Sequence, residues 1–237
     1  MPPFGEFVAM IAALMALAAM SIDIMLPALP DIAASFGVAD PNAAQLVVTD
    51  YLLGFAAGQL VFGPLADRFG RRAVLFAGLG LYALGAFACL VAGSFEVLLA
   101  ARFAQGLACA APRVIAVAVV RDVYGGRRMA QVMSFVMMVF IVVPVVAPSL
   151  GGAILLAAAW PAIFGLLFVL ALALIAWTAL RLPETRAPEH RLPLRARSVT
   201  DAFLAVLRSR PTLGYTIAGG VVLGALMGYI ASAQQVY

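Results

Sequence analysis

Four ionisable side chains stand inside long apolar segments of this sequence, and they are the residues best placed to do chemistry. They are Asp23, Asp50, Arg102 and Arg113. A charge at the centre of a membrane helix costs about 2.5–3.5 kcal/mol, so each residue needs a partner or water. Burial favours the neutral form of a carboxyl group, and a nearby arginine favours the ionised form. The four residues predict a proton or substrate site, with a purely structural salt bridge as the alternative.

A polar stripe extends along the apolar segment that contains both arginines. Arg102 is followed at i+3, i+7 and i+11 by Gln105, Cys109 and Arg113. Eleven residues are close to three helical turns, so these side chains share one face. A polar face on a membrane helix should border a bundle interior or a water-filled cavity.

The depth of each charge follows from its distance to the end of its segment, at about 1.5 Å per residue. Asp23, Asp50 and Arg102 come out at a similar level in the outer half of the bilayer. We therefore expect Arg102 to pair with one of the two acids. Arg113 lies deeper, with no acid at its own level. Thr49 or water is the alternative partner for Asp50.

Proline and glycine mark two places where a helix should deviate. Pro27 has no N–H, so the carbonyl of Asp23, four residues back, loses its helical partner. An acid beside an unbonded carbonyl suits proton handling, although a simple kink is the alternative. A second group of prolines and glycines consists of Pro144, Pro148, Gly151 and Gly152. These residues predict a helix bend of the kind that a hinge would need.

Composition shows which solvent surrounds these residues. Apolar residues make up 65% of the 237-residue chain, against about 45–50% in soluble domains. A soluble core of this size could not bury so much apolar surface, so we predict an all-α integral membrane protein. Seven segments are long enough to span a bilayer, namely 7–29, 43–65, 73–93, 97–120, 129–152, 160–181 and 212–234.

The arginines predict the topology. The chain has no lysine, and 13 of its 15 arginines lie between segments or at their ends. All 13 fall in alternate loops, and the loops between them have none. Because positive charge marks the cytoplasmic side, we expect a cytoplasmic N-terminus in the inner (plasma) membrane. The basic excess reports orientation and not nucleic-acid binding.

The spans divide the chain into a six-helix bundle over 1–181, a cytoplasmic linker over 182–211, and one further span within 212–237. A single span after the linker has no partners, so we expect a truncated transporter. A half-transporter that works as a homodimer, or an inactive fragment, is the alternative.

Other classes of membrane protein fit less well. A seven-span receptor would place its N-terminus outside, and a retinal protein needs a lysine. Cys89 and Cys109 lie inside apolar segments as small apolar residues, and the single histidine, His190, lies in the linker. We therefore expect no metal site, no cofactor and no enzyme activity.

Several motifs together resemble the major facilitator superfamily. The inner turn "GPLADRFGRRAV" (63–74) is similar to its signature G-x-L-A-D-R-x-G-R-R/K. "RFAQG" (102–106) resembles the span-four motif R-x-x-Q-G, and "VVPVVAPSLGG" (142–152) resembles the antiporter motif of span five. With "LPET" (182–185), "RDVYGGRRMA" and "MLPALPDI", the set looks like the Bcr/CflA drug–proton antiporters.

The resemblance implies a fold and a function. The fold would be the N-terminal bundle of a twelve-helix transporter, built from 3+3 inverted repeats. The function would be proton-coupled efflux of lipophilic drugs by alternating access. Its partners would be drugs, protons, the lipid bilayer and the missing C-terminal bundle.

The resemblance also implies roles for matched residues. Asp23 looks like the membrane-embedded acid of related antiporters, and Arg102 would couple its protonation to drug release. Gly151 and Gly152 would set the bend in span five. Asp67 would latch against a helix end of the other half. The inner-gate hinge as a whole would consist of Gly63, Asp67, Arg68, Gly70 and Arg71.

Overall fold

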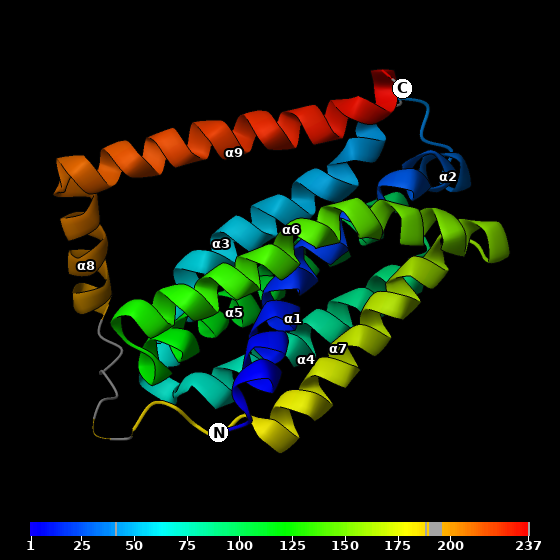
Figure 1. Cartoon of the computed structure of the whole chain (residues 1–237). Coiled ribbons are helices and arrows are strands. Elements are labelled where there is room, and N and C mark those ends of the chain that lie inside the picture. The colour runs from blue at the N-terminus through cyan, green and yellow to red at the C-terminus, as the bar shows by residue number, and fades with distance from the viewer. Residues whose placement is uncertain (41, 188, 190–195, 237) are drawn as a thin grey trace. The chain divides into compact units, whose positions relative to one another are not determined.

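The computed structural model describes residues 1–40, 42–187, 189 and 196–236 (Figure 1). All regular elements in this part of the chain are helices, as predicted. The chain divides into two compact units, Met1–Arg191 and Leu192–Tyr237. His190, Arg191 and Arg195 of the predicted linker lie outside the described residues.

The first unit holds the helices expected for the six-helix bundle, together with two short 3-10 turns, η1 and η2. Their bounds are α1 Phe4–Asp23, η1 Leu26–Ala28, α2 Leu29–Ser35, η2 Ala43–Gln45, α3 Leu46–Phe69, α4 Arg71–Leu90, α5 Phe95–Val123, α6 Gly126–Ala157 and α7 Pro161–Arg181.

Six helical segments among the described residues are long and apolar enough to cross a bilayer. They are Phe4–Ser35, Ala43–Phe69, Arg71–Leu90, Phe95–Val123, Gly126–Ala157 and Pro161–Arg181. They match the first six predicted spans, and the largest difference is at the end of the first. Apolar side chains such as Leu84 and Val145 remain exposed on the exterior, as expected of a surface that faces lipid.

The first span is interrupted where Pro27 predicts a break. Helix α1 ends at Asp23, and the chain continues through η1 into α2. Pro27 cannot donate to the carbonyl of Asp23, which weakens the regular α-helix at this point, and here the helix ends. The predicted kink is confirmed, and it places the carboxyl group of Asp23 at the last residue of α1.

The turn between α3 and α4 consists of one residue, Gly70, with φ +95°. A residue with a Cβ rarely adopts this conformation. The turn is therefore as short as the charged motif around it suggests, and it brings Asp67, near the end of α3, next to the first turn of α4.

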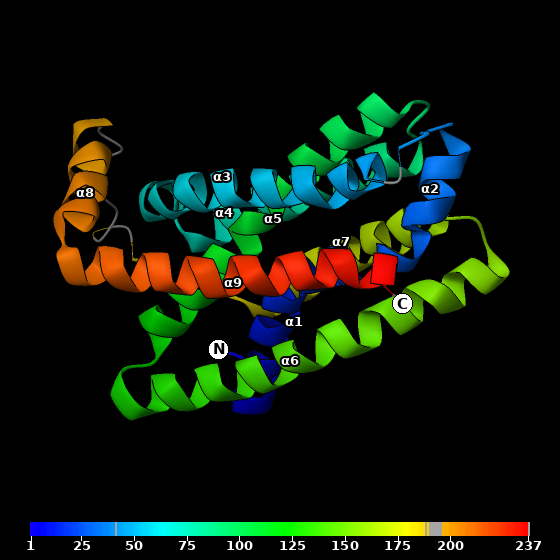
Figure 2. The same ribbon diagram turned by 90° about the horizontal axis from the view of Figure 1, so that it is seen from above.

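Small residues let α5 approach its neighbours closely. A Cβ at Gly106 would meet the backbone carbonyl of Tyr51, and one at Gly54 would meet the carbonyl of Phe103. On the α4 side, a Cβ at Gly78 would meet the side chain of Ala111. Figure 2 shows α3, α4 and α5 side by side, with α1 against α6. This close packing of small residues is typical of membrane helices.

The second unit contains α8 (Ala196–Arg208) and α9 (Arg210–Val236). The predicted seventh span, 212–234, lies within α9. The predicted linker contains a helix that the sequence analysis did not identify. Its apolar residues Val199, Phe203 and Val206 recur at i, i+4 and i+7, which is the period of an amphipathic helix.

Candidate functional site

Arg102 is fully buried and joins three helices by hydrogen bonds. Its Nε donates to the carbonyl of Val47, at the start of α3, at 3.0 Å. One terminal nitrogen donates to Gln105 Oε1 on α5 at 2.7 Å. The other donates to the carbonyl of Ser21 on α1 at 3.2 Å. The guanidinium therefore ties α1 and α3 to α5.

The faces of this guanidinium lie near aromatic rings. Its Cζ is 4.2 Å from the ring centre of Tyr51 and 5.7 Å from that of Phe164. None of the ion pairs among the described residues includes Arg102, Asp23 or Asp50. The expected pairing of the arginine with an acid is therefore wrong. Depth follows from rise along a helix, but the direction of a side chain depends on how each helix is rotated.

Ser21, Tyr51, Tyr82 and Cys89 are further buried polar residues near Arg102 and Gln105, and these four were not expected in the site from the sequence. Ser21 Oγ and the Tyr82 hydroxyl are 2.6 Å apart. Cys89 Sγ donates to Gln105 Oε1 at 3.8 Å. The hydroxyl of Tyr51 has no hydrogen-bond partner in the described part of the chain. The tyrosines inside apolar segments were a signal in the sequence that could have indicated this cluster. A buried tyrosine hydroxyl usually needs a polar partner, so other polar groups are expected nearby.

Asp23 is only 5% exposed, and its carboxyl group makes no ion pair or hydrogen bond with the described residues. It is adjacent to the point where α6 passes the break in the first span. A Cβ at Gly151 would meet the carbonyl of Ile24, so the two backbones touch there. The buried acid, the helix break and the contact with α6 thus occur together.

Asp50 is partly buried on α3. The hydroxyl of Thr49 donates to the carbonyl of Gln45 at 3.1 Å and so does not serve Asp50. Thr49 is therefore excluded as its partner. The hydroxyl of a threonine in a helix reaches the carbonyl four residues back more readily than the next side chain along the chain.

Arg113 lies on the same helix as Arg102 but in different surroundings. It is partly buried, and its Cζ is 5.6 Å from the ring centre of Phe140 on α6. It makes no ion pair with the described residues. The polar stripe therefore runs from Arg102, which is fully buried, to Arg113, which lines a cavity.

This cavity has a volume of about 690 Å³ and lies between α3, α5 and the segment after α7. Its lining residues are Gln59, Gly63, Asp67, Arg71, Arg113, Val114, Val117, Ala118, Arg121, Asp122 and Arg186.

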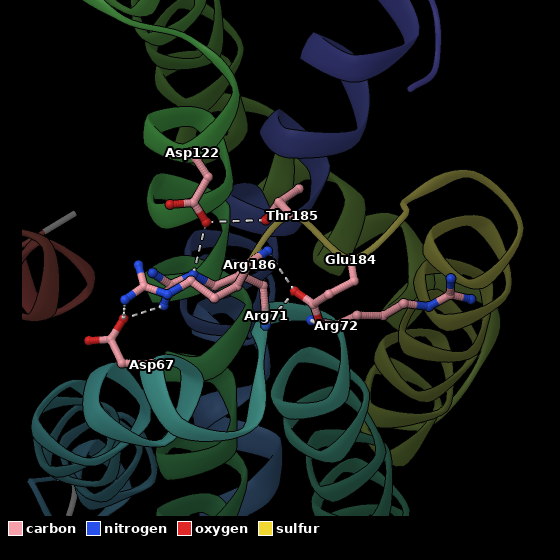
Figure 3. Close-up of polar contacts among 7 residues, drawn as sticks. All are labelled: Asp67, Arg71, Arg72, Asp122, Glu184, Thr185 and Arg186. Carbon is pink, nitrogen blue, oxygen red and sulfur yellow. Dashed lines mark hydrogen bonds and ion pairs between the residues drawn. The ribbon is translucent and has the colours of Figure 1, made fainter. Parts of the chain in front are cut away.

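A network of charged groups joins the ends of three helices around the turn between α3 and α4 (Figure 3). Arg71 pairs with Asp67 at 2.9 Å and with Asp122, near the end of α5, at 3.1 Å. The hydroxyl of Thr185 donates to Asp122 at 3.2 Å. Arg186 lies 3.9 Å from Asp67. The charged turn of the motif therefore has partners within this unit.

Glu184 completes the network by capping α4. Its carboxylate accepts hydrogen bonds from the backbone N–H groups of Arg71 at 2.9 Å and Arg72 at 3.1 Å. These are the first two residues of the helix, whose N–H groups have no partner within it. The preceding residue, Gly70, has no side chain with which to cap. Neither Glu184 nor Asp122 was expected in the site from the sequence, although they stand in the motifs "LPET" and "RDVYGGRRMA".

The five residues of the inner-loop motif occupy distinct positions. Asp67 and Arg71 belong to the network, Gly63 lines the cavity, and Gly70 forms the turn. Arg68 is exposed and makes no ion pair with the described residues.

The residues predicted to bend span five lie within one continuous helix. Helix α6 runs from Gly126 to Ala157 through Pro144 and Pro148. Of the two glycines, Gly151 touches the first span, whereas Gly152 faces open space.

Replacing Glu184 with alanine should destabilise the first turn of α4 by about 1–2 kcal/mol, because two N–H groups lose a charged acceptor. Hydrogen exchange at the amides of Arg71 and Arg72 should become faster. Glu189→Ala, at an exposed position of the same segment, is the control. Unchanged exchange in the Glu184 variant would show that the cap does not contribute.

Comparison with known proteins agrees with this arrangement. A profile described as Major Facilitator Superfamily matches residues 11–237. An uncharacterized MFS-type transporter, YdgK, from Bacillus subtilis is 36% identical over 220 residues, which cover 92% of this chain and 54% of the relative. A bicyclomycin resistance protein homolog from Haemophilus influenzae is 33% identical, covering 100% of this chain and 55% of the relative.

Further similarities extend the comparison. Multidrug resistance protein MdtL from Shewanella oneidensis is 34% identical over 201 residues, which cover 85% of this chain and 49% of the relative. The crystal structure of the human organic anion transporter MFSD10 superposes with a TM-score of 0.66 at 23% identity, over 88% of this chain and 55% of that one, and supports the fold alone. The chain spans about half the length of the curated relatives it matches.

Proposed function

Because this chain belongs to the major facilitator superfamily, we propose that it forms one helix bundle of a proton-coupled drug exporter in the bacterial inner membrane. Relatives named for bicyclomycin and multidrug resistance support lipophilic drugs as the substrates. Alternating access requires two bundles. The second is either a further segment of the same protein or a second copy of this chain.

The observation that carries the proposal is the position of Asp23. Its carboxyl group is buried, has no cationic partner in the described part of the chain, and ends α1 at the helix break. An ionised carboxylate in such surroundings needs a cation or water. We propose that Asp23 holds a proton while the site is closed and releases it when water or a drug reaches the site. The proton acts as the coupling ion, without a cofactor.

Arg102 has a positioning role in this scheme. It binds the carbonyl of Ser21, two residues before Asp23. Because the same guanidinium also binds α3 through Val47, it holds the end of α1 in place. Coupling between Arg102 and the proton then passes through the position of α1 and not through a salt bridge.

The charged network is the proposed latch. The segments rich in arginine meet at one end of the unit, as the contacts of Arg71 with Asp122 and Glu184 indicate. Arg181 pairs with Glu6 there at 2.5 Å. We propose that this end faces the cytoplasm, as the arginine excess predicts. The pairs of Asp67 would then be remade as the two bundles move.

Proton-driven transport by inverted membrane vesicles tests the proposal. The chain is expressed alone and together with the C-terminal bundle of the Haemophilus influenzae relative, and the uptake of a fluorescent lipophilic drug is followed. One proton moving through 100 mV supplies about 2.3 kcal/mol, which sustains a gradient of about fifty-fold at 1.36 kcal/mol per tenfold step. Asp23→Asn should abolish this gradient.

Asp31→Asn is the matched control, because Asp31 is an exposed acid on α2. This variant should keep the full gradient. Uptake by the chain alone would support the homodimer, whereas uptake only with the added bundle would support a transporter of two different halves. Full proton coupling in Asp23→Asn would exclude Asp23 as the proton carrier.

A further inference from the structure

The cavity lined by Arg113 carries more positive than negative groups. Four arginines and two aspartates line its volume of about 690 Å³. This volume lies within the range of about 300–1,000 Å³ that is typical of small-molecule sites. The charged lining residues are Asp67, Arg71, Arg113, Arg121, Asp122 and Arg186.

The two aspartates already have cationic partners. Asp67 pairs with Arg71 at 2.9 Å and with Arg186 at 3.9 Å. Asp122 pairs with Arg71 at 3.1 Å. The other two arginines of the cavity are therefore left without a carboxylate in the described part of the chain.

Arg113 is the deeper of these two arginines. It is partly buried, and the ring of Phe140 lies 5.6 Å from its guanidinium carbon. Val114 and Val117 add apolar surface to the same cavity, and no described atom beyond the adjoining residues and backbone of α3 lies within 4 Å of the position that a Cβ would occupy at Gly63. The surroundings thus combine one unpaired cation, an aromatic ring, aliphatic groups and open space.

We propose that this cavity binds an amphiphilic organic anion, with its anionic group on the guanidinium of Arg113 and its apolar part against Val114 and Val117. A guanidinium offers paired N–H donors that match a carboxylate, sulfonate or phosphate. Arg121 lies eight residues further along α5, about 12 Å at 1.5 Å per residue, where its charge attracts anions to the cavity.

This inference deepens the proposed function by naming a substrate class. It rests on that function only for the export of the bound anion, and not for its binding. The same chemistry occurs in two sources, an exported organic anion and the headgroup of an acidic phospholipid. Binding is measured at equilibrium without transport, so the inference and the proposed function can fail separately.

The test uses the whole chain in nanodiscs of phosphatidylcholine. Fluorescence anisotropy measures binding of dansylglycine, an anion, and of dansyl ethylenediamine, a cation with the same fluorophore. The anion should bind more tightly. Arg113→Gln should weaken its binding about tenfold, as loss of one charge-assisted contact predicts, whereas Arg113→Lys should weaken it less.

Two further variants separate the cavity from general charge. Arg128→Gln removes an equal charge at an exposed position on α6 outside the cavity, and it should leave binding unchanged. Gly63→Leu fills the open space without changing charge, and it should weaken binding. Equal binding of the two probes, or an equal effect of the Arg113 and Arg128 variants, would overturn the inference.

A lipid titration identifies the source of the anion. Phosphatidylglycerol is added to the nanodiscs in increasing fraction. If it displaces dansylglycine from the unmodified chain, the site binds a phospholipid headgroup. If dansylglycine stays bound, the site selects an organic anion from solution. Both results support an anion site that depends on Arg113.

Discussion

Replacing Arg102 with alanine is expected to destabilise the first unit by about 3–5 kcal/mol. The side chain is fully buried, so its removal leaves a void. It also leaves the carbonyls of Ser21 and Val47 without the donor that joins α1 and α3 to α5. Thermal unfolding in mild detergent measures the loss. Labelling of the buried free thiols of Cys89 and Cys109 with a thiol reagent reports unfolding without any introduced cysteine.

The control for this experiment is Arg128→Ala, which removes an exposed arginine from the start of α6. Its free energy of unfolding should change by less than about 0.5 kcal/mol. Cys89 contacts Gln105, which itself binds Arg102, so its labelling could respond to a local change at the site. Circular dichroism is therefore recorded in parallel to measure unfolding of the helices as a whole. An Arg102 variant as stable as the control would mean that the guanidinium does not hold the three helices together.

Gly106→Ala is expected to destabilise the packing of α3 against α5 by about 3 kcal/mol, at the upper end of the usual cost of overpacking. The added Cβ would meet the carbonyl oxygen of Tyr51, with the carbonyl carbon of the same residue at 2.8 Å. These are backbone atoms, so the helices must separate because no side chain can rotate away. The free energy of unfolding is measured as for Arg102.

Gly80→Ala provides a control of opposite sign. Gly80 also lies within a membrane helix, but nothing stands within 4 Å of the position of its Cβ. Alanine is favoured over glycine in a helix by about 1 kcal/mol, so this variant should be neutral or stabilised. Equal effects of the two substitutions would contradict the close approach of α3 and α5.

Much of the architecture could be predicted because its physical causes are local or compositional. The length of each apolar segment must match the bilayer, so the six spans follow from hydrophobicity alone. The break after Asp23 follows from the missing N–H of Pro27. The resemblance to the superfamily, drawn from motifs such as "GPLADRFGRR", is confirmed by the match over residues 11–237.

The partners of the charged residues could not be predicted in the same way. Spacing placed Arg102 and Asp23 at one level, but the guanidinium turns instead to carbonyl groups of two helices. Glu184 caps a helix that begins at Arg71, 113 residues earlier in the chain. Neither contact has a periodic signal in the sequence.

For this protein, the sequence alone determined which segments enter the membrane, where the first of them breaks, and which buried residues carry charge. Those properties depend on hydrophobicity and on backbone chemistry within a few residues. Only the tertiary structure decided that Asp23 has no cationic partner among the described residues and that Arg113 borders a cavity. Such contacts depend on how helices rotate and approach one another, and glycines such as Gly106 set that approach.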